Sequence, residues 1–187
     1  MKPIDRWLQR WRIAKALPFV RPGDRLLDVG CYDRSLIDRA LPRIERAVGI
    51  DLEAAPSRGD RVEILRGAFP GGHRFEDGAF DCITMLAVLE HVDAPEALAR
   101  ECARVLAPGG RLVVTVPHPF VDVLLDGMMA LRLIDGMATE EHHGFDVGRT
   151  RTIFEQAGLA LVRDRRFQLG LNRLFVFERP DPAARRD

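Results

Sequence analysis

The chain has 187 residues, of which 47% are hydrophobic, and its 28 basic and 28 acidic side chains cancel to a formal net charge of +0. This length and composition predict one domain with a sizeable core. The balanced charge excludes recruitment of nucleic acid or an anionic membrane by the overall field, so any such binding has to be local. The clearest basic run contains Arg163, Arg165 and Arg166, and we interpret it as a solvated strand face.

The first residues read MKPIDRWLQRWRIAKAL, with charges every few positions. This pattern predicts neither a signal-peptide core nor a membrane span. Apolar residues fit one side of a helix, so residues 1–20 are expected to form an N-terminal helix. The residues on that side are Trp7, Leu8, Trp11 and Leu17.

The three cysteines, Cys31, Cys82 and Cys102, are odd in number and have neither metal-site nor disulfide-framework spacing. This pattern is typical of reduced thiols. We therefore predict a cytoplasmic protein without a transmembrane segment.

After the N-terminal helix, apolar runs alternate with helical patterns, which predicts a doubly wound α/β sheet. The nine residues from Glu53 to Arg61 join VGIDL to the third expected strand, fewer than a parallel crossover normally needs, so we expect a loop or one helical turn there. The expected strands are 25–30, 46–51, 62–65, 80–86 and 111–117.

The most regular helical pattern is DAPEALARECARVLAPGG, between the fourth and fifth expected strands. Asp93 is expected to cap this helix, with Glu96 completing a capping box. Gly109 and Gly110 are expected to end it.

The remaining third of the chain starts with apolar residues at helical spacing over 121–137. A helix packed on the core and a mobile lid over a pocket both fit this pattern, and we treat 119–147 as a lid-like insertion. A short helix ending at Gly158 follows. The stretch LALVRDRRFQLGLNRLFVFERP then predicts an antiparallel hairpin, and 180–187 a flexible tail.

Candidate ligand-binding residues follow the first two strands. Ligands of open α/β sheets bind beyond the carboxyl ends of the strands. Gly30 follows the first strand, and Asp51 ends the second, 23 residues after Asp28. An acid there can accept hydrogen bonds from both hydroxyls of a ribose, which predicts an adenosine-containing ligand. A dinucleotide turn needs further glycines where Tyr32 stands, so a pyrophosphate, and with it a nicotinamide oxidoreductase, is disfavoured.

At these residues the chain resembles the class I S-adenosylmethionine (SAM)-dependent methyltransferases, over most of residues 24–179. The resemblance rests on LLDVGC, VGIDL, FEDGAFDCITMLAVLEHV and RECARVLAPGGRLVVTVP. It implies SAM as cofactor. It also implies an α/β, Rossmann-like seven-stranded sheet over 21–179 that is mostly parallel with an antiparallel last strand.

The family's first loop usually reads Asp-x-Gly-x-Gly-x-Gly, whereas this chain has Tyr32 and Arg34 at the later glycines. Tyr32 either packs over the methionine arm of SAM or fills the place of the cofactor. The family's acid after the third strand is absent from RGAFPGG, so adenine recognition would fall on backbone groups near Ala68 and Phe69. The cofactor-binding residues that the resemblance implies are Asp28, Gly30, Cys31, Tyr32, Asp51, Leu52, Ala68, Phe69 and Leu86.

Methyl transfer from a sulfonium gains much of its acceleration from orienting the two reactants, and a hydroxyl acceptor also needs a base. His118 is the first catalytic candidate because it follows the fifth strand in VPHP, although a loop histidine bonded to backbone fits that position as well. His91, in LEHV, is the second, with an implied role in shaping the pocket. Glu90, these histidines and the EEHH run at 140–143 lack fixed ligand spacing, so no metal site is assigned.

These observations predict a SAM-dependent methyltransferase that acts on a small-molecule, glycan or lipid-intermediate acceptor, at oxygen rather than at carbon or nitrogen. The alternative is a noncatalytic relative that uses the fold as a binding or partner module, motivated by the missing glycines and the missing acid. No general nucleic-acid binding is expected.

Overall fold

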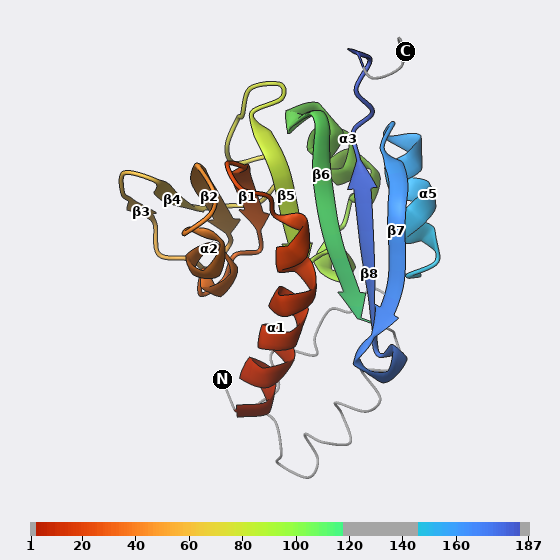
Figure 1. The fold of residues 1–187 in the computed structure, drawn as a ribbon, viewed down its shortest axis with the longest axis horizontal. Helices are drawn as coiled ribbons and strands as arrows, with labels where there is room; N and C mark the ends of the chain where they lie inside the picture. Colours follow the sequence, from red (N-terminus) through yellow and green to blue (C-terminus); the bar gives the residue numbers. More distant parts are fainter. Residues whose placement is uncertain (1–2, 118–145, 184–187) are drawn as a thin grey trace.

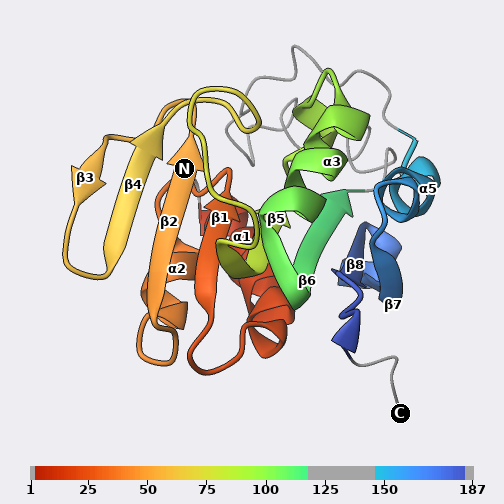
Figure 2. The same ribbon diagram turned by 90° about the horizontal axis from the view of Figure 1, so that it is seen from above.

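A computed structural model describes residues 3–117 and 146–183, and its strands form one sheet in the order β3-β4-β2-β1-β5-β6-β8-β7 (Figures 1 and 2). β4, β2, β1, β5 and β6 run parallel, while β8 lies antiparallel between β6 and β7. The predicted doubly wound sheet with an antiparallel last strand is therefore confirmed. The strands are β1 Arg25–Val29, β2 Arg46–Asp51, β3 Ser57–Arg58, β4 Val62–Arg66, β5 Phe80–Leu86, β6 Leu106–Pro117, β7 Ala160–Phe167 and β8 Asn172–Glu178.

The sheet has eight strands where the sequence analysis predicted seven, because β3 adds a two-residue strand at one edge. This strand also corrects the expected loop or helical turn between β2 and β4. Ser57 pairs with Ile64 in antiparallel register, and the Gly59 N–H donates to the Val62 carbonyl at 2.8 Å to close the turn. Pro56 favours an extended chain at this point.

Helices cover both faces of the sheet, as Figures 1 and 2 show. α1 Pro3–Ala16 and α2 Ser35–Ala40 pack on one face, over a buried cluster that includes Leu26 and Val113. α3 Pro95–Val105 and α5 Arg149–Gln156 pack on the other, over a cluster that includes Leu27 and Val114. Neighbouring residues of one strand thus serve opposite cores, which is the alternation that a strand imposes. Three short 3-10 turns complete the described elements: η1 Leu17–Phe19, η2 Leu89–His91 and η4 Gln168–Gly170.

The boundaries of α3 differ from the prediction. Ala94 occupies the N-cap position without a side-chain cap, so Asp93 does not cap the helix. Glu96 instead forms an ion pair with Arg149 at 3.0 Å. The helix ends at Val105, ahead of the glycine pair, because Leu106 already pairs with Phe80 of β5 and is fully buried there.

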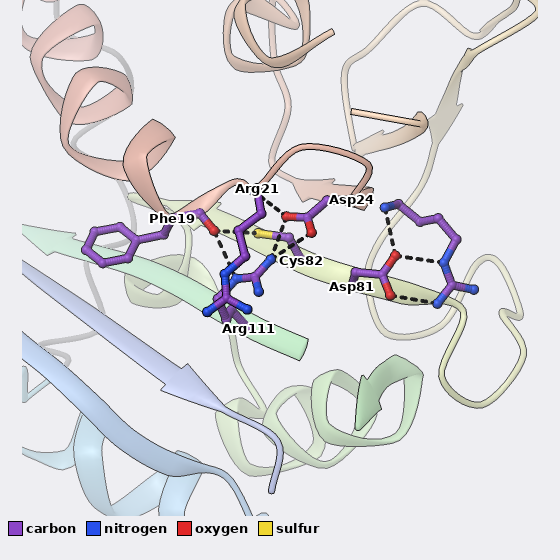
Figure 3. A network of polar contacts seen from close by, with 7 residues as sticks. Phe19, Arg21, Asp24, Asp81, Cys82 and Arg111 are labelled. Carbon is purple, nitrogen blue, oxygen red and sulfur yellow. Dashed lines mark hydrogen bonds and ion pairs between the residues drawn. The ribbon is translucent and has the colours of Figure 1, made fainter. Parts of the chain in front are cut away.

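One buried and one half-buried ion pair hold the amino ends of the strands together (Figure 3). The Arg111 guanidinium donates to both carboxylate oxygens of Asp24 at 2.7 and 2.6 Å, and both side chains are less than a tenth exposed. Its Nε also donates to the Phe19 carbonyl at 3.0 Å. Arg25 contacts Asp81 at 2.8 Å beside it. Removing one partner of such a buried pair typically costs about 3–5 kcal/mol, so this edge is a rigid base for the opposite one.

At the N-terminus α1 is followed by η1, and the buried face of this helix is shifted from the predicted one. Ile13 and Ala16 are buried, while Trp7 is 55% exposed and meets Trp11 edge-on at 4.9 Å. None of the helices within 3–117 and 146–183 has the length and apolar character needed to cross a bilayer.

The C-terminal hairpin is also confirmed. β7 and β8 pair antiparallel from Ala160↔Glu178 to Phe167↔Asn172. The basic run Arg163, Arg165 and Arg166 is exposed on β7, as a solvated strand face should be. Almost all of the predicted insertion 119–147 lies outside the described residues, as does the end of the predicted tail 180–187, and both stay predictions.

Candidate cofactor site

The carboxyl ends of β1 and β2 meet in a tightly bonded loop. Val29 and Ile50 are register partners at the ends of the two parallel strands. The Ile50 carbonyl accepts the Gly30 N–H at 2.8 Å, and the Asp51 Oδ2 accepts the Tyr32 N–H at 3.1 Å. The loop that follows β1 is therefore held against the end of β2, which is where sequence analysis placed the ribose-binding acid.

This first loop has a left-handed backbone at alternate residues. Gly30, Tyr32 and Arg34 have φ values of 72°, 44° and 54°. These are the three positions at which the pattern Asp-x-Gly-x-Gly-x-Gly has glycine. The chain therefore keeps the glycine-type loop conformation with other residues, at a cost on the order of 1 kcal/mol for each of them.

Gly30 is the one glycine of the three that the chain retains, and the structure shows why. A Cβ atom at this position would lie 2.3 Å from the Cγ2 atom of Val88, in the loop after β5. The first loop and the β5 loop thus approach each other closely at Gly30, and no larger residue fits without displacing one of them.

The Tyr32 side chain is 46% exposed. A tyrosine ring that filled the cofactor pocket would be buried, whereas this side chain is exposed to solvent. This exposure favours the first of the two alternatives for Tyr32, in which the ring lies over a bound ligand rather than in its place.

Asp51 has a fixed orientation. Its Oδ2 accepts the Tyr32 N–H, and its Oδ1 accepts the Glu53 N–H at 2.8 Å. An ionised carboxylate has about four acceptor positions, so two remain for the two hydroxyls of a ribose. The Asp51 carbonyl meanwhile accepts the Gly67 N–H at 3.0 Å, which brings the loop after β4 to the same place.

Asp28 is a buried acid beneath this loop. It is 3% exposed, and its Oδ1 accepts a hydrogen bond from the Thr84 hydroxyl at 2.6 Å. Burial is the main reason why the pKa of Asp28 is raised to about 7; the nearby negative charges of Asp51 and Asp33 act in the same direction, and the hydrogen bond from Thr84 opposes them. Sequence analysis missed Thr84, although a single hydroxyl in the apolar strand FDCITML was a signal.

The three carboxylates fit the net positive charge of SAM, which carries a sulfonium, an ammonium and a carboxylate group. Asp51 and Asp33 lie near enough to Asp28 to raise its pKa. A cation bound there would relieve this repulsion and favour the ionised form of Asp28. Together with the open acceptor positions of Asp51, these residues fit SAM as the ligand.

The adenine side of the site has one buried and two exposed apolar side chains. Leu52 is 70% exposed, and Ala68 is exposed as well. Phe69 is 8% exposed and packs toward Phe75, with 6.2 Å between ring centroids. Because the Phe69 side chain is buried, any contact of this residue with a ligand would come from its backbone groups, and that contact stays a prediction. Leu86 packs against the core cluster beneath α1 and α2.

Cys31 offers backbone groups rather than a reactive thiol. Its side chain is 5% exposed, and its Sγ would lie 2.8 Å from a Cβ atom at Gly49. Burial and the charges of Asp28 and Asp51 raise the pKa of Cys31 to about 12. The thiol is therefore protonated at neutral pH and unreactive.

Of the two candidate catalytic histidines, the structure describes His91 alone. His91 is exposed at the end of η2, which follows β5. Its backbone N–H donates to the Val88 carbonyl at 3.0 Å. His118 lies outside the described residues. Within residues 3–117 and 146–183, no group of three or more His, Cys, Asp or Glu side chains is placed to hold a metal ion.

Comparison with known families agrees with this geometry. The family model described as "Methyltransferase domain" matches residues 5–164. The chain belongs to the class I SAM-dependent methyltransferases. The predicted family, the Rossmann-like fold and the cofactor SAM are thereby confirmed.

Two curated relatives of this methyltransferase bear the name "Ubiquinone biosynthesis O-methyltransferase". That of Nitrosococcus oceani is 29% identical over 66% of this chain and 57% of the relative. That of Xanthomonas campestris pv. campestris is 35% identical over 50% of this chain and 43% of the relative. The chain spans about half of the length of these relatives.

A solved structure shows the same fold. The Burkholderia thailandensis 1,6-didemethyltoxoflavin-N1-methyltransferase, with bound 1,6-didemethyltoxoflavin and S-adenosylhomocysteine, aligns with a TM-score of 0.68. It covers 95% of this chain and 82% of its own, at 19% sequence identity. At this identity the alignment supports the fold of the methyltransferase alone.

Replacing Tyr32 by glycine tests the left-handed loop. We expect Tyr32→Gly to be more stable than Tyr32→Ala by about 1 kcal/mol, because alanine keeps the unfavourable φ whereas glycine relieves it. Urea denaturation of both variants measures the difference. Alanine being as stable as glycine would contradict a left-handed Tyr32.

Replacing Asp28 by asparagine tests the buried acid. The folded-state pKa of about 7 lies above the ordinary 3.8, so the stabilisation from the protonated carboxyl is complete below about pH 4 and is lost as the pH rises through 7. Asparagine accepts the same Thr84 bond but does not titrate. From pH 4 to 8, the wild-type free energy of unfolding should therefore fall relative to Asp28→Asn, by an amount on the order of 4 kcal/mol. Urea denaturation across this range measures it, and a constant difference would contradict the assignment.

Proposed function

We propose that the protein transfers a methyl group from SAM to a hydroxyl of a small apolar acceptor. The observation that supports this most strongly is the Asp51 carboxylate, held by two backbone N–H groups at the end of β2 beside the left-handed first loop. That arrangement is suited to a ribose and leaves the space beyond β1 for an amino-acid tail.

The chain's own residues would act chiefly by placing the reactants. When bound, SAM supplies an electrophilic methyl group on a sulfonium that leaves as a neutral thioether. Asp51 would orient the ribose, and the first loop would orient the methionine arm. The attacking hydroxyl has to lose its proton as its oxygen bonds to the methyl carbon, so we propose His118 as the base that takes it. His91 would shape the acceptor side of the same pocket.

The acceptor is proposed on two grounds. The curated relatives are named for ubiquinone biosynthesis and for methylation at oxygen. In addition, Tyr32 and Leu52 expose apolar surface at the carboxyl edge. Both favour a hydroxyl on an apolar small molecule or lipid intermediate over a glycan. We keep 119–147 as a lid over this acceptor, because the apolar pattern of 121–137 follows β6 directly.

Asp51→Asn tests the cofactor site. Asparagine keeps one acceptor oxygen but loses the charge that strengthens bonds to the ribose, so the Kd for SAM should rise at least about tenfold by titration calorimetry. Asp60→Asn, an exposed acid in the turn after β3, is the matched control and should bind normally. Equal affinity in both variants would remove Asp51 from the site. An absence of heat from wild-type protein at millimolar SAM would favour the noncatalytic alternative.

His118→Ala tests the base, with a catechol carrying an apolar tail as acceptor and mass spectrometry of the methylated product. We expect kcat to fall about 10²-fold or more, with SAM affinity unchanged and part of the rate regained at high pH, where the phenol ionises without help. His91→Ala is the comparison variant and should raise the KM for the acceptor without this pH dependence. Joint loss of SAM affinity and turnover in His118→Ala would overturn the base assignment.

A further inference from the structure

Large apolar side chains are exposed mainly at one edge of the molecule. Among the described residues, Trp7, Tyr32, Leu52 and Leu169 are 55%, 46%, 70% and 98% exposed. Tyr32 and Leu52 directly follow β1 and β2, and Leu169 follows β7, whose end lies at the same edge because β7 runs parallel to β6. Val162, within β7, is the fifth such residue. Tyr32 and Leu52 belong to the proposed cofactor site, whereas Trp7 and Leu169 have no role there.

Leu169 is held outward by a strained turn. Gln168, Leu169 and Gly170 have φ values of 52°, 57° and 88°, three left-handed residues in a row. The turn is stabilised from inside by Gln168, which is 4% exposed, donates to the Leu8 carbonyl at 3.2 Å and accepts a bond from Asn172. Backbone strain that the surroundings maintain is a feature of functional sites, and here it presents a leucine to solvent.

The adjacent half of α1 combines an aromatic residue with positive charge. The Gln168–Leu8 bond places this part of α1 beside the Leu169 turn. Arg6, Trp7 and Arg10 share the exposed side of the helix at positions i, i+1 and i+4. The helix sequence has four basic residues and only Asp5 as an acid, although the whole chain is neutral. Positive charge is thus concentrated where the apolar side chains project.

We propose that Trp7, Leu169, Arg6 and Arg10, which we call the docking edge, bind the surface of an anionic phospholipid membrane. Tryptophan is favoured at the boundary between headgroups and acyl chains, a projecting leucine gains by entering it, and arginines bind the lipid phosphates. Docking in this way turns the carboxyl edge toward the lipid. The proposal deepens the proposed function, because an apolar acceptor would be drawn from the membrane.

Two other occupants fit the docking edge less well. A nucleic acid would use the arginines but leave Leu169 in water, and the docking edge has one aromatic ring, Trp7, where single-strand binding sites stack successive bases on several. A second copy of this chain, in a two-fold dimer, would gather the arginines of both copies in one interface, and the docking edge contains no acid to pair with them. An anionic membrane offers phosphates to Arg6 and Arg10 and an apolar interior to Leu169.

Flotation of the full chain with vesicles tests the proposal. We expect binding to vesicles of phosphatidylcholine with about a third phosphatidylglycerol, weak binding to phosphatidylcholine alone, and loss of binding at high salt. Leu169→Ser should weaken binding about tenfold, and Arg6→Glu with Arg10→Glu by more than that. The matched controls are Val162→Ser, an exposed apolar residue within β7, and Arg39→Glu with Arg43→Glu, two exposed arginines at and after the end of α2. Both should bind as the wild type does.

A fluorescence measurement separates docking from altered folding. In Trp11→Phe, Trp7 is the single tryptophan, so brominated phosphatidylglycerol should quench its emission on binding. Absence of quenching, or equal binding by all variants, overturns the proposal. So does tighter binding to a single-stranded oligonucleotide than to vesicles, or a dimer that Leu169→Ser dissociates.

The two proposals fail separately. Vesicle binding without methylation of the apolar catechol would contradict the proposed acceptor and still support the docking edge. Methylation of the catechol in solution without vesicle binding would do the reverse. SAM calorimetry of Leu169→Ser should match the wild type in either case.

Discussion

The end of β2 sets the geometry on which the candidate site depends. The Ile50 carbonyl accepts the Gly30 N–H, and the Asp51 carbonyl accepts the Gly67 N–H. The Asp51 carboxylate accepts the N–H groups of Tyr32 and Glu53. Asp51, which we propose as a ligand-binding group, is therefore a structural group as well. The strand register that pairs Val29 with Ile50 fixes the height of the loop relative to the acid, so the two parts of the cofactor site cannot move independently.

Left-handed non-glycine residues and the buried Arg111–Asp24 ion pair lie at opposite ends of the sheet. The non-glycine left-handed residues of the described chain are Tyr32, Arg34, Ala87, Gln168 and Leu169, and all of them follow the carboxyl end of a strand. At the amino ends, buried Arg111 bonds Asp24 through two oxygens. This separation is physically sensible, because a strained edge persists only when the rest of the structure holds it. The rigid amino edge makes the irregular carboxyl edge possible.

Most of the fold was predictable from the sequence, because apolar periodicity determines the parallel strands. The features that escaped prediction depend on partners distant in the chain. β3 forms because Ser57 pairs with Ile64 of β4, and α3 ends early because Leu106 pairs with Phe80 of β5. In the site, Asp51 was predictable from its position, whereas the bond from Thr84 to Asp28 needs the register between β1 and β5. The left-handed conformation of Tyr32 was not predicted for a different reason, because a tyrosine rarely adopts it.

The role of α1 unites these observations. Its Gln9 side chain donates to Asp33 of the first loop at 3.0 Å, and its Leu8 carbonyl accepts from Gln168 beneath the Leu169 turn. One helix thus contacts both the cofactor loop and the exposed apolar turn. Because Asp33 also adds to the negative field that raises the pKa of Asp28, a displacement of α1 would alter the electrostatics of the site as well as its shape. The N-terminal helix covers one face of the sheet, and it therefore also links the outer surface to the candidate cofactor site.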